Sequence, residues 1–535
     1  MRRTRVRENL ISPHHNPSTK ILNFFQSEFN LFTIVVFIYL ILSLWGILKH
    51  EMWRDELQTW MIARDSSSIA DILFCMRYEG HPPLWHLLLF FITRFTSHPF
   101  FMQLLHVLIA TLSIVIFLNF SPFSKLQKIL FTFGYFPFYE YVVKSRNYAI
   151  GMLFVFLFCT YFSTPTKKYL VLFGILFFLS QTNFMGTVIA ICLGLFLLWN
   201  LYANRKTIKQ FTEAGVLLGI IIFFCGIVLS ISEAILPPET FHSWSTVFFT
   251  TVSVKRIQEV MCNINKVYMV FPFSVTIRYL DFSFLKKMNL FLSAFELMFL
   301  FFFFLCKPRI LFLYLSGTLG LLILFYVKYG ALWHTGHLYI IVMATLWLAH
   351  YMPPIEMRSK YIGLLSTFAQ KYCNVFLIII LSSHYMGGAI ANVKDWVYPY
   401  SEAKETAQFI RDNHMEKMLM VGDDDAQVSA IAGYLNHKIY YVRGNRFGSY
   451  CLWDRKRERG VTPEEVIQKA HELMLQYRQS VLIILNYELS RDKMINCLKK
   501  IKEFTRKSIV YDEIYYLYLL PYREDAQRIV KYKYQ

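Results

Sequence analysis

The segment MWRDELQTWMIARDSSSIADILFCMRYEGHPPLWH (residues 52–86) directly follows the first long apolar run of the chain, residues 31–48. It combines Trp53, Trp60 and Trp85 with a dense group of Arg, Asp and Glu residues. Membrane proteins keep most ionisable groups where water can reach them. The segment therefore marks a membrane surface, and the side on which it lies fixes the topology of the rest.

The composition is that of a membrane protein. Of 535 residues, 55% are hydrophobic and 17% are charged, whereas soluble domains average about 25% charged residues. Several apolar runs reach the roughly 17–25 residues that cross a bilayer as a helix. The net charge of +19 comes largely from Lys and Arg in short loops, as the positive-inside rule expects. The chain carries no RNA- or DNA-binding signature, so no nucleic-acid partner is expected.

The cysteines and the N-terminus exclude other classes. The nine cysteines are scattered and form no CxxC pair, so neither a disulfide framework nor a zinc knuckle is indicated. The start, MRRTRVRENL, is basic, but the first apolar run has no small-residue cleavage site. This pattern favours a retained anchor over a cleaved signal peptide.

The basic loops predict the topology. A cytoplasmic N-terminus sends the first span outward and leaves residues 52–86 outside. The next apolar stretch, 82–95, is too short for a ~30 Å hydrocarbon core, so we expect it to be interfacial or re-entrant. If it crossed, the sides of the following segments would reverse. About eleven spans are expected, the later ones near 101–120, 126–142, 147–163, 169–183, 185–201, 213–235, 289–305, 309–327, 337–352 and 374–391. The connecting loops 163–168, 203–210, 306–309 and 353–360 then all lie inside, and each is basic.

From about residue 393 the sequence changes to the pattern of a soluble α/β domain. Helix-like stretches alternate with strand-like ones. The helices are expected at 401–414, 426–437, 462–479 and 490–505, and the strands at 417–422, 438–444, 480–486 and 508–519. The chain thus divides into a membrane part, 1–392, with its first outer loop at 50–100, and an extracytoplasmic domain, 393–535. The run Asp423-Asp424-Asp425 follows a strand, where α/β domains place ligand sites, but it also suits a solvated helix cap.

The opening loop combines an apolar stripe with acids. On a helix, Trp53, Leu57, Trp60 and Met61 share one face, and tryptophan favours the membrane interface. We expect this face to rest on the outer leaflet, with Asp55 on the opposite side facing water. The same pattern also fits a solvated loop helix with an aromatic anchor.

A second cluster closes this loop. Pro82 and Pro83 suit the first turn of a helix and would hold Glu79 and His81 at the membrane surface. Together with the Asp55-Glu56 pair, they form a candidate acid/base site.

The order of these motifs resembles the GT-C class of membrane glycosyltransferases, in particular bacterial protein O-mannosyltransferases and lipid A aminoarabinose transferases. Asp55-Glu56 follows the first span, and HPPL (81–84) opens a short apolar segment. In YEYVVKSRNYAIGMLF (139–154), Glu140 precedes an Arg-x-Tyr pattern at 146–148. The resemblance covers the membrane part, while the C-terminal domain matches only in position and general class.

The resemblance implies an enzyme that moves a sugar from a polyprenyl-phosphate carrier to an acceptor hydroxyl on the outer face of the plasma membrane, with inversion. Asp55 would be the general base and Glu56 a supporting acid. Arg146 would stabilise the departing phosphate, followed as candidates by Lys144 and Lys328. Phe-rich spans would hold the lipid tail. The sugar, and whether the acceptor is a glycan, lipid or protein, stay open. The other candidate substrate-binding residues are Glu79, His81, Glu140, Tyr148, His334 and His337.

Simpler roles remain for several of these residues. Arg146 and Lys144 could be interfacial anchors, Glu140 could pair with one of them, and His81 could be a structural hydrogen bonder. His334 and His337 could bind the carrier phosphate or a divalent metal. Two ligands at i, i+3 spacing are thin evidence for a metal, and the related families often have an Arg-His or similar pair at this point.

Two other functional classes compete with the transferase. A secondary transporter or lipid flippase would place ionisable groups at mid-membrane on broken helices, often within inverted repeats. The chain shows no internal repeat, and its acids cluster at the predicted outer surface. A scaffold of envelope assembly would leave Asp55-Glu56 without a role.

Overall fold

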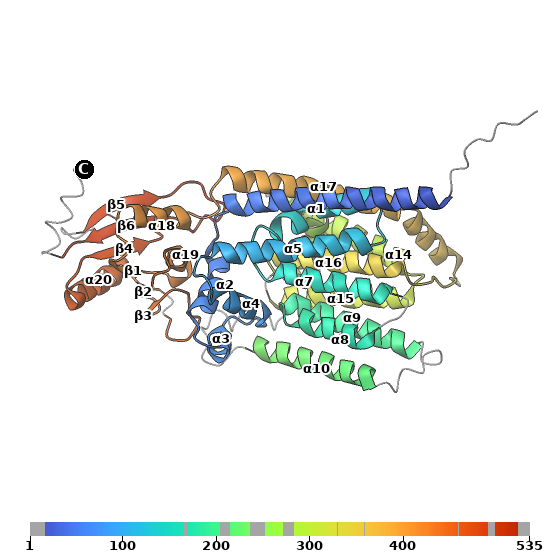
Figure 1. Cartoon of the computed structure of the whole chain (residues 1–535), viewed down its shortest axis with the longest axis horizontal. Helices are drawn as coiled ribbons and strands as arrows, with labels where there is room; N and C mark the ends of the chain where they lie inside the picture. The colour runs from blue at the N-terminus through green and yellow to red at the C-terminus, as the bar shows by residue number, and fades with distance from the viewer. Residues whose placement is uncertain are drawn as a thin grey trace, which may run out of the picture.

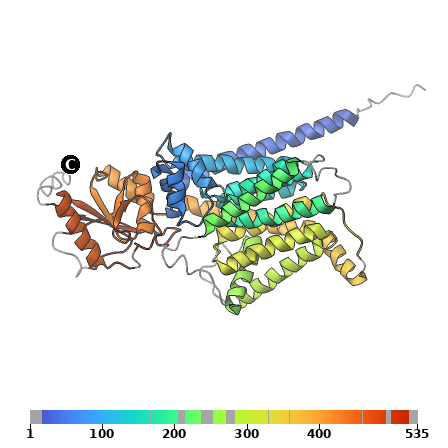
Figure 2. The same ribbon diagram turned by 90° about the horizontal axis from the view of Figure 1, so that it is seen from below.

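The structure, a computed structural model of the whole chain, describes residues 17–522 apart from 165–167, 204–213, 236–251, 271–282, 329, 358, 458–459 and 491–497. A bundle of helices forms one lobe and a small α/β domain forms the other, with short helices between them (Figures 1 and 2). The principal bundle helices are α1 (Pro17–Lys49), α5 (Phe100–Phe120), α7 (Tyr148–Ser163), α8 (Tyr169–Ser180), α9 (Phe184–Ala203), α10 (Ala214–Ala234), α12 (Val254–Tyr268), α14 (Ser283–Phe304), α15 (Pro308–Val327), α16 (Leu332–Ala349) and α17 (Lys360–Val397).

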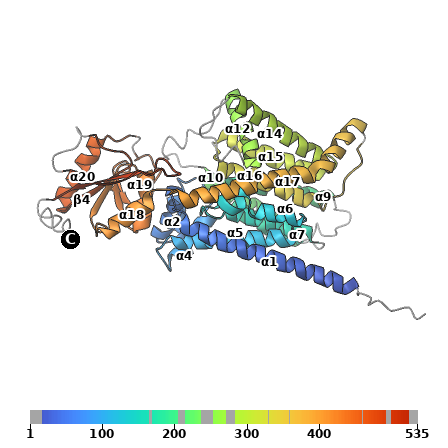
Figure 3. The same cartoon turned by 90° about the horizontal axis from the view of Figure 1, so that it is seen from above.

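The bundle is built from membrane spans. In the described part of the chain, eight helices are long and apolar enough to cross a bilayer, namely α1, α5, α9, α10, α14, α15, α16 and α17. The protein is therefore a multi-pass membrane protein. The shorter apolar helices α7 and α8 lie at two further predicted spans. In Figure 3, α17 runs from the far end of the bundle to the α/β domain, and it ends at Val397, slightly beyond the expected boundary.

The predicted span at 126–142 is wrong as a single helix. It divides into α6 (Lys125–Thr132) and a π-helical turn, η1 (Phe136–Glu140). Pro137 has no N–H for a regular helical hydrogen bond, and the Tyr141 N–H instead donates to Phe136 O at 2.8 Å. The chain then leaves the helix early and forms an irregular loop that reaches the opening segment.

The opening segment forms three short helices at the end of the bundle that faces the α/β domain (Figure 1). They are α2 (Arg54–Asp65), α3 (Ile69–Met76) and α4 (Leu84–Thr93). Ten residues of α-helix rise only about 15 Å, so α4 is too short to cross a bilayer, as expected. It packs against α2.

The expected contact between the α2 stripe and the bilayer is wrong. Leu57, Trp60 and Met61 are fully buried in a core shared by α2, α4 and helix α19 of the C-terminal domain. The periodicity identified an apolar face but carried no information about its partner. A protein surface covers this face instead of lipid.

The C-terminal domain contains a six-stranded sheet of order β3-β2-β1-β4-β6-β5. Strands β1, β2 and β4 are parallel to one another, and β3, β6 and β5 pair antiparallel. Alternate residues of β1 face opposite sides, so Met420 packs toward the membrane part and Val421 toward α20. The elements are α18 (Ala403–Asp412), β1 (Leu419–Gly422), α19 (Asp425–Leu435), β2 (Ile439–Tyr441), β3 (Arg446–Gly448), α20 (Pro463–Tyr477), β4 (Val481–Leu485), β5 (Lys499–Phe504) and β6 (Tyr515–Leu520).

The helix expected at 490–505 is wrong over its last residues. Lys499–Phe504 forms the edge strand β5, paired with β6, and residues 491–497 lie outside the described part. Lysines are common on edge strands because they discourage pairing with other chains. Strand β3 was not predicted. The other helices and strands of the domain lie where the sequence places them, within a few residues, except that the strand expected at 508–519 begins only at Tyr515.

Polar contacts also join the two lobes. Arg54 Nη1 donates to Asp512 Oδ2 at 2.9 Å, and the Arg54 backbone N–H donates to Glu513 Oε1 at 3.1 Å. Tyr434 of α19 donates to the carbonyl of Met52 at 3.1 Å. These contacts link residues 52–54 to α19 and to the segment that precedes β6.

Gly433 permits the close approach of α19 to α2. A Cβ at this position would lie 3.2 Å from Leu57 Cβ and from Met61 Sδ. We expect Gly433→Val to push the helices apart at a cost of about 1–3 kcal/mol, as overpacking does. Lower thermal stability and faster proteolytic release of the C-terminal domain would report this. Gly460→Val is the matched control, because nothing lies within 4 Å of its added Cβ. Equal behaviour of the two variants would contradict the described packing.

Candidate active site

A cleft of about 380 Å³ lies where the two lobes meet. Three segments line it: the opening loop, the loop that follows η1, and the C-terminal domain. Their cleft-lining residues include Asp55, Gln58, Glu79, His81, Trp85 and His86 from the first, Arg146 and Asn147 from the second, and Asp424, Gln427, Arg443, Trp453 and Arg457 from the third.

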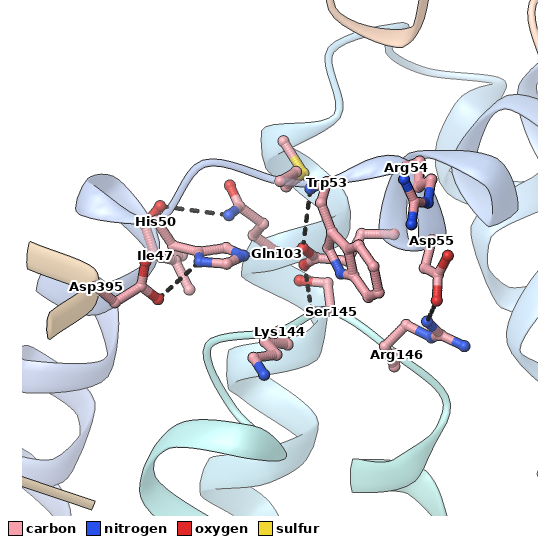
Figure 4. A network of polar contacts seen from close by, with 12 residues as sticks. Ile47, His50, Trp53, Arg54, Asp55, Gln103, Lys144, Ser145, Arg146 and Asp395 are labelled. Carbon is pink, nitrogen blue, oxygen red and sulfur yellow. Dashed lines mark hydrogen bonds and ion pairs between the residues drawn. The ribbon is translucent and has the colours of Figure 1, made fainter. Parts of the chain in front are cut away.

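Asp55 and Arg146 form an ion pair inside this cleft (Figure 4). Arg146 Nη1 lies 2.6 Å from Asp55 Oδ2, and the Asp55 side chain is 36% exposed. Burial opposes the charge of Arg146, but Tyr148 and Asp55 outweigh it and raise its pKa. The cleft therefore holds a permanent cation beside a solvent-accessible carboxylate. This contact confirms the prediction that the two loops lie on one side of the membrane part.

Glu56 points away from the cleft into a buried network. Its Oε2 lies 2.8 Å from His50 Nε2, and its Oε1 accepts the Ser145 N–H at 2.6 Å. His50 Nδ1 lies 2.8 Å from Asp395 Oδ2 of α17 (Figure 4). Two neighbouring residues of α2 thus bind two neighbouring residues of the loop that follows η1. Glu56 accepts a hydrogen bond from Ser145, and Asp55 forms an ion pair with Arg146. Through this network Glu56 can support Asp55 by position.

Burial and charge act against each other in this network. Burial disfavours the imidazolium form of His50, but Asp395 and Glu56 outweigh it and raise the pKa of His50 to about 10. Burial likewise opposes ionisation of Glu56, but His50 and the Ser145 N–H bring its pKa below the usual value. The network therefore consists of one cation between two anions.

Lys144 and Glu140 pair with each other outside the cleft. Lys144 Nζ lies 2.8 and 3.0 Å from the two carboxylate oxygens of Glu140, and Tyr135 donates to the same carboxylate at 2.9 Å. The rings of Tyr139, Trp333 and Tyr400 lie 5.1–5.8 Å from the ammonium. Lys144 points away from Asp55 in Figure 4. This environment favours the simpler interpretation, a structural ion pair.

Basic residues gather on the membrane side of the cleft. We define the basic floor as Arg146, His81 and His86, which line the cleft, with Lys328 and His334 behind them. Burial lowers the pKa of His81, and the positive charges of Lys328 and Arg146 lower it further. Burial also lowers the pKa of His86 to about 3 and lowers that of Lys328. The two cleft histidines are therefore neutral hydrogen-bonding groups beside a guanidinium.

His334 and His337 do not form a chelating pair. The two ring nitrogens of His334 lie 3.1 and 3.2 Å from Ala331 N and Trp333 Nε1. His337 Nδ1 lies 2.9 Å from the carbonyl of His334. Tyr148 stacks near Arg146, with its ring centre 5.6 Å from the guanidinium carbon. Among the residues that the structure describes, no three His, Cys, Asp or Glu side chains converge on a possible metal position.

Glu79 connects the cleft to the C-terminal domain through Gln58. Gln58 Nε2 donates to Glu79 Oε1 at 2.8 Å and to Cys451 O at 2.7 Å, and Gln58 Oε1 accepts the Cys451 N–H at 3.0 Å. Burial raises the pKa of Glu79 to about 7. Sequence reasoning missed Gln58, although it lies one helical turn after Asp55 and so on the same face.

Comparison with known proteins identifies the fold. No family model and no curated protein matches the chain. Two crystal structures of ArnT from Cupriavidus metallidurans, one in the apo state and one bound to undecaprenyl phosphate, each match with a TM-score of 0.50 and 11% sequence identity. The matches cover 92% of this chain and 98% of apo ArnT, and 91% and 97% for the bound form. ArnT is a lipid A aminoarabinose transferase of the GT-C class. The chain therefore has the fold of these ArnT structures, with a helical membrane part followed by a small C-terminal α/β domain.

Proposed function

We propose that the protein is a glycosyltransferase that moves a sugar from a polyprenyl-phosphate carrier to an acceptor hydroxyl on the periplasmic face of the inner membrane. The observation that carries this proposal is the Asp55–Arg146 pair, which joins a solvent-accessible carboxylate to a partly buried cation in one cleft. A protein of the same fold is known in a form bound to undecaprenyl phosphate. The acids of the cleft, among them Asp55 and Glu79, lie at one end of the bundle, which favours an enzyme over a transporter that works at mid-membrane.

The chemistry assigned to the cleft is a single displacement. Asp55 accepts the proton of the acceptor hydroxyl, and the hydroxyl oxygen attacks the anomeric carbon. The bond from that carbon to the phosphate oxygen breaks, and the electron pair leaves with the phosphate. One displacement inverts the anomeric centre. Positioned general bases of this kind contribute about 10²–10⁴-fold to the rate.

Arg146 and the basic floor would receive the leaving phosphate. A guanidinium carries five N–H donors and can bind phosphate through two of them at once. In this structure Nη1 of Arg146 bonds to Asp55, so phosphate binding and the release of Asp55 would be coupled. His81 and His86, kept neutral by burial, add hydrogen bonds without proton exchange. Lys328, whose positive charge acts on His81, adds to the positive potential of the basic floor.

The test is the set of envelope sugars made with and without the protein. Glycolipids, glycans and glycoproteins of a deletion strain are compared by mass spectrometry with those of the strain complemented by the wild-type protein. We expect one sugar mass to disappear on deletion and to return on complementation. An unchanged set of envelope sugars would reject the proposal.

The pKa of Glu79 predicts a pH dependence of binding of the carrier phosphate. Its pKa of about 7 means that the group is neutral below that pH and negative above it. The extra charge beside Arg146 repels phosphate, so binding of undecaprenyl phosphate should weaken roughly three- to tenfold between pH 6 and pH 8. Glu79→Gln retains an acceptor for Gln58 but cannot ionise, and it should remove this part of the pH dependence. Because the carrier phosphate itself titrates, the comparison of the two proteins is the readout. Identical profiles would exclude Glu79 from the site.

A further inference from the structure

The C-terminal wall of the cleft contains an alternating chain of charges. Arg443 Nε lies 3.0 Å from Asp423 Oδ1, and Arg443 Nη1 lies 3.0 Å from Asp424 Oδ2. Arg457 Nη2 lies 2.9 Å from Asp424 Oδ1, and Arg457 Nε lies 2.8 Å from Asp425 Oδ1. We name these five residues the Asp–Arg ladder. Asp424, Arg443 and Arg457 line the cleft, whereas Asp423 and Asp425 are fully buried. The ladder joins three segments of the domain, which contain residues 423–425, Arg443 and Arg457.

The ladder lies where an α/β sheet places ligands. Asp423, Asp424 and Asp425 follow the carboxyl end of β1, which pairs in parallel with β2 on one side and β4 on the other. The chain passes from β1 through α19 to β2, and β4 follows on the opposite side of β1. This reversal makes the carboxyl end of β1 a topological switch point, the usual place of a crevice for ligands. In this protein that edge of the sheet borders the cleft.

Three residues that line the cleft carry buried polar atoms without partners in the described structure. Trp85 is 1% and His86 2% exposed, and Trp85 Nε1 and both ring nitrogens of His86 have no hydrogen-bond partner in the described structure. Gln427 Oε1 on the opposite wall is likewise buried and unpartnered. All three residues line the cleft. Buried polar groups of this kind cost free energy unless a ligand or water satisfies them.

Trp453 supplies an aromatic surface beside these groups. It lines the cleft, and the guanidinium carbon of Arg457 lies 4.8 Å from its ring centre. Arg457 is in turn held by Asp424 and Asp425. The indole is therefore fixed by the ladder instead of being a mobile loop side chain.

We propose that this wall, formed by Trp453, Gln427 and Asp424, is the binding site for a saccharide ring. The C–H faces of a sugar stack on an aromatic ring, while its hydroxyl groups donate to carboxylates and pair with amides. The inference rests on the proposed function, since it assigns the sugar side of the same cleft. The two sides differ in their polar groups: the basic floor offers Arg146 to phosphate, whereas the carboxylate and guanidiniums of the wall are already paired with one another. The ring bound at the wall belongs either to the donor or to the acceptor.

The experiment measures sugar binding directly. The full-length protein in lipid nanodiscs is examined by saturation-transfer NMR with methyl glycosides of glucose, galactose, mannose and glucosamine at millimolar concentration. We expect at least one glycoside to receive saturation from the wild-type protein, and Trp453→Ala to reduce its affinity roughly three- to tenfold. Trp199→Ala, in the membrane helix α9, is the matched control. No signal with any glycoside, or equal signals for Trp453→Ala and wild type, would overturn the proposal.

Two additions complete the test. If Trp453→Ala lowers thermal stability, Gln427→Ala takes its place, and it should weaken binding of the same glycoside. A synthetic polyprenyl phosphate that carries the same sugar as the bound glycoside then identifies the source of the ring: displacement of the glycoside assigns the wall to the donor sugar, and retention assigns it to the acceptor. Sugar binding without any change of envelope sugars on deletion would reject the transferase and keep the site. The reverse result would reject only the site.

Discussion

Asp55→Asn is expected to abolish sugar transfer while the protein stays folded and abundant. Asparagine preserves the shape of the side chain and an oxygen for Arg146, but it cannot accept the hydroxyl proton at neutral pH. The rate should fall by about 10²–10⁴-fold, the contribution of a positioned general base. Because the Asp55 side chain is 36% exposed, loss of its ion pair should cost little stability.

The measurement is complementation of the deletion strain, with envelope sugars read by mass spectrometry and protein abundance by immunoblot. Asp412→Asn, on the exposed surface of α18, is the matched control and should restore the sugar fully. Undecaprenyl phosphate should still bind to Asp55→Asn, since Arg146 and the basic floor remain. Full restoration by Asp55→Asn would show that another group is the base.

His50→Leu is expected to have the largest effect on stability. It leaves the buried carboxylates of Glu56 and Asp395 without their cation, and breaking such a buried pair typically costs about 3–5 kcal/mol. The midpoint of thermal unfolding in detergent should fall by several degrees. His471→Leu, on the exposed face of α20, is the control and should unfold like the wild type. A wild-type midpoint for His50→Leu would contradict the network.

The same network predicts how stability depends on pH. The folded-state pKa of His50 is about 10, against about 6.5 in an unfolded chain. The folded protein therefore holds a proton more tightly, and this contribution is fully present below about pH 6.5 and lost as the pH rises through about 10. The midpoint of wild-type unfolding should decline over this interval. His50→Leu should lack that part of the decline.

The membrane helices could be predicted because each is a local property of the sequence. An apolar run of about 20 residues predicts a span without knowledge of its neighbours. Counting basic loops then placed Asp55 and Arg146 on one side, and their ion pair bears this out. The break within 126–142 also has a local cause, Pro137, which can be read from the sequence. The apolar residues around it nevertheless favoured the prediction of one continuous span.

The rest depended on contacts between distant segments. The stripe containing Leu57 and Met61 is equally apolar whether it faces lipid or α19. The KKIKEF stretch of β5 has helix-compatible charges, and only its pairing with β6 makes it a strand. The wall with Trp453 and Gln427 could not be predicted, because no spacing in the sequence connects it with Asp55. The roles of Asp55, Arg146 and the other candidate site residues stay predictions until the variants are measured.

The contact of Arg54 with Asp512 and Glu513 has a consequence for biogenesis. The residue beside the proposed base is synthesised 458 residues before Asp512 and 459 residues before Glu513. The cleft can therefore be completed only after synthesis has passed residue 513 and the C-terminal domain has folded. Membrane insertion and completion of the cleft are thus separate events in time, and a newly inserted bundle has an incomplete cleft until the segment around residue 513 arrives.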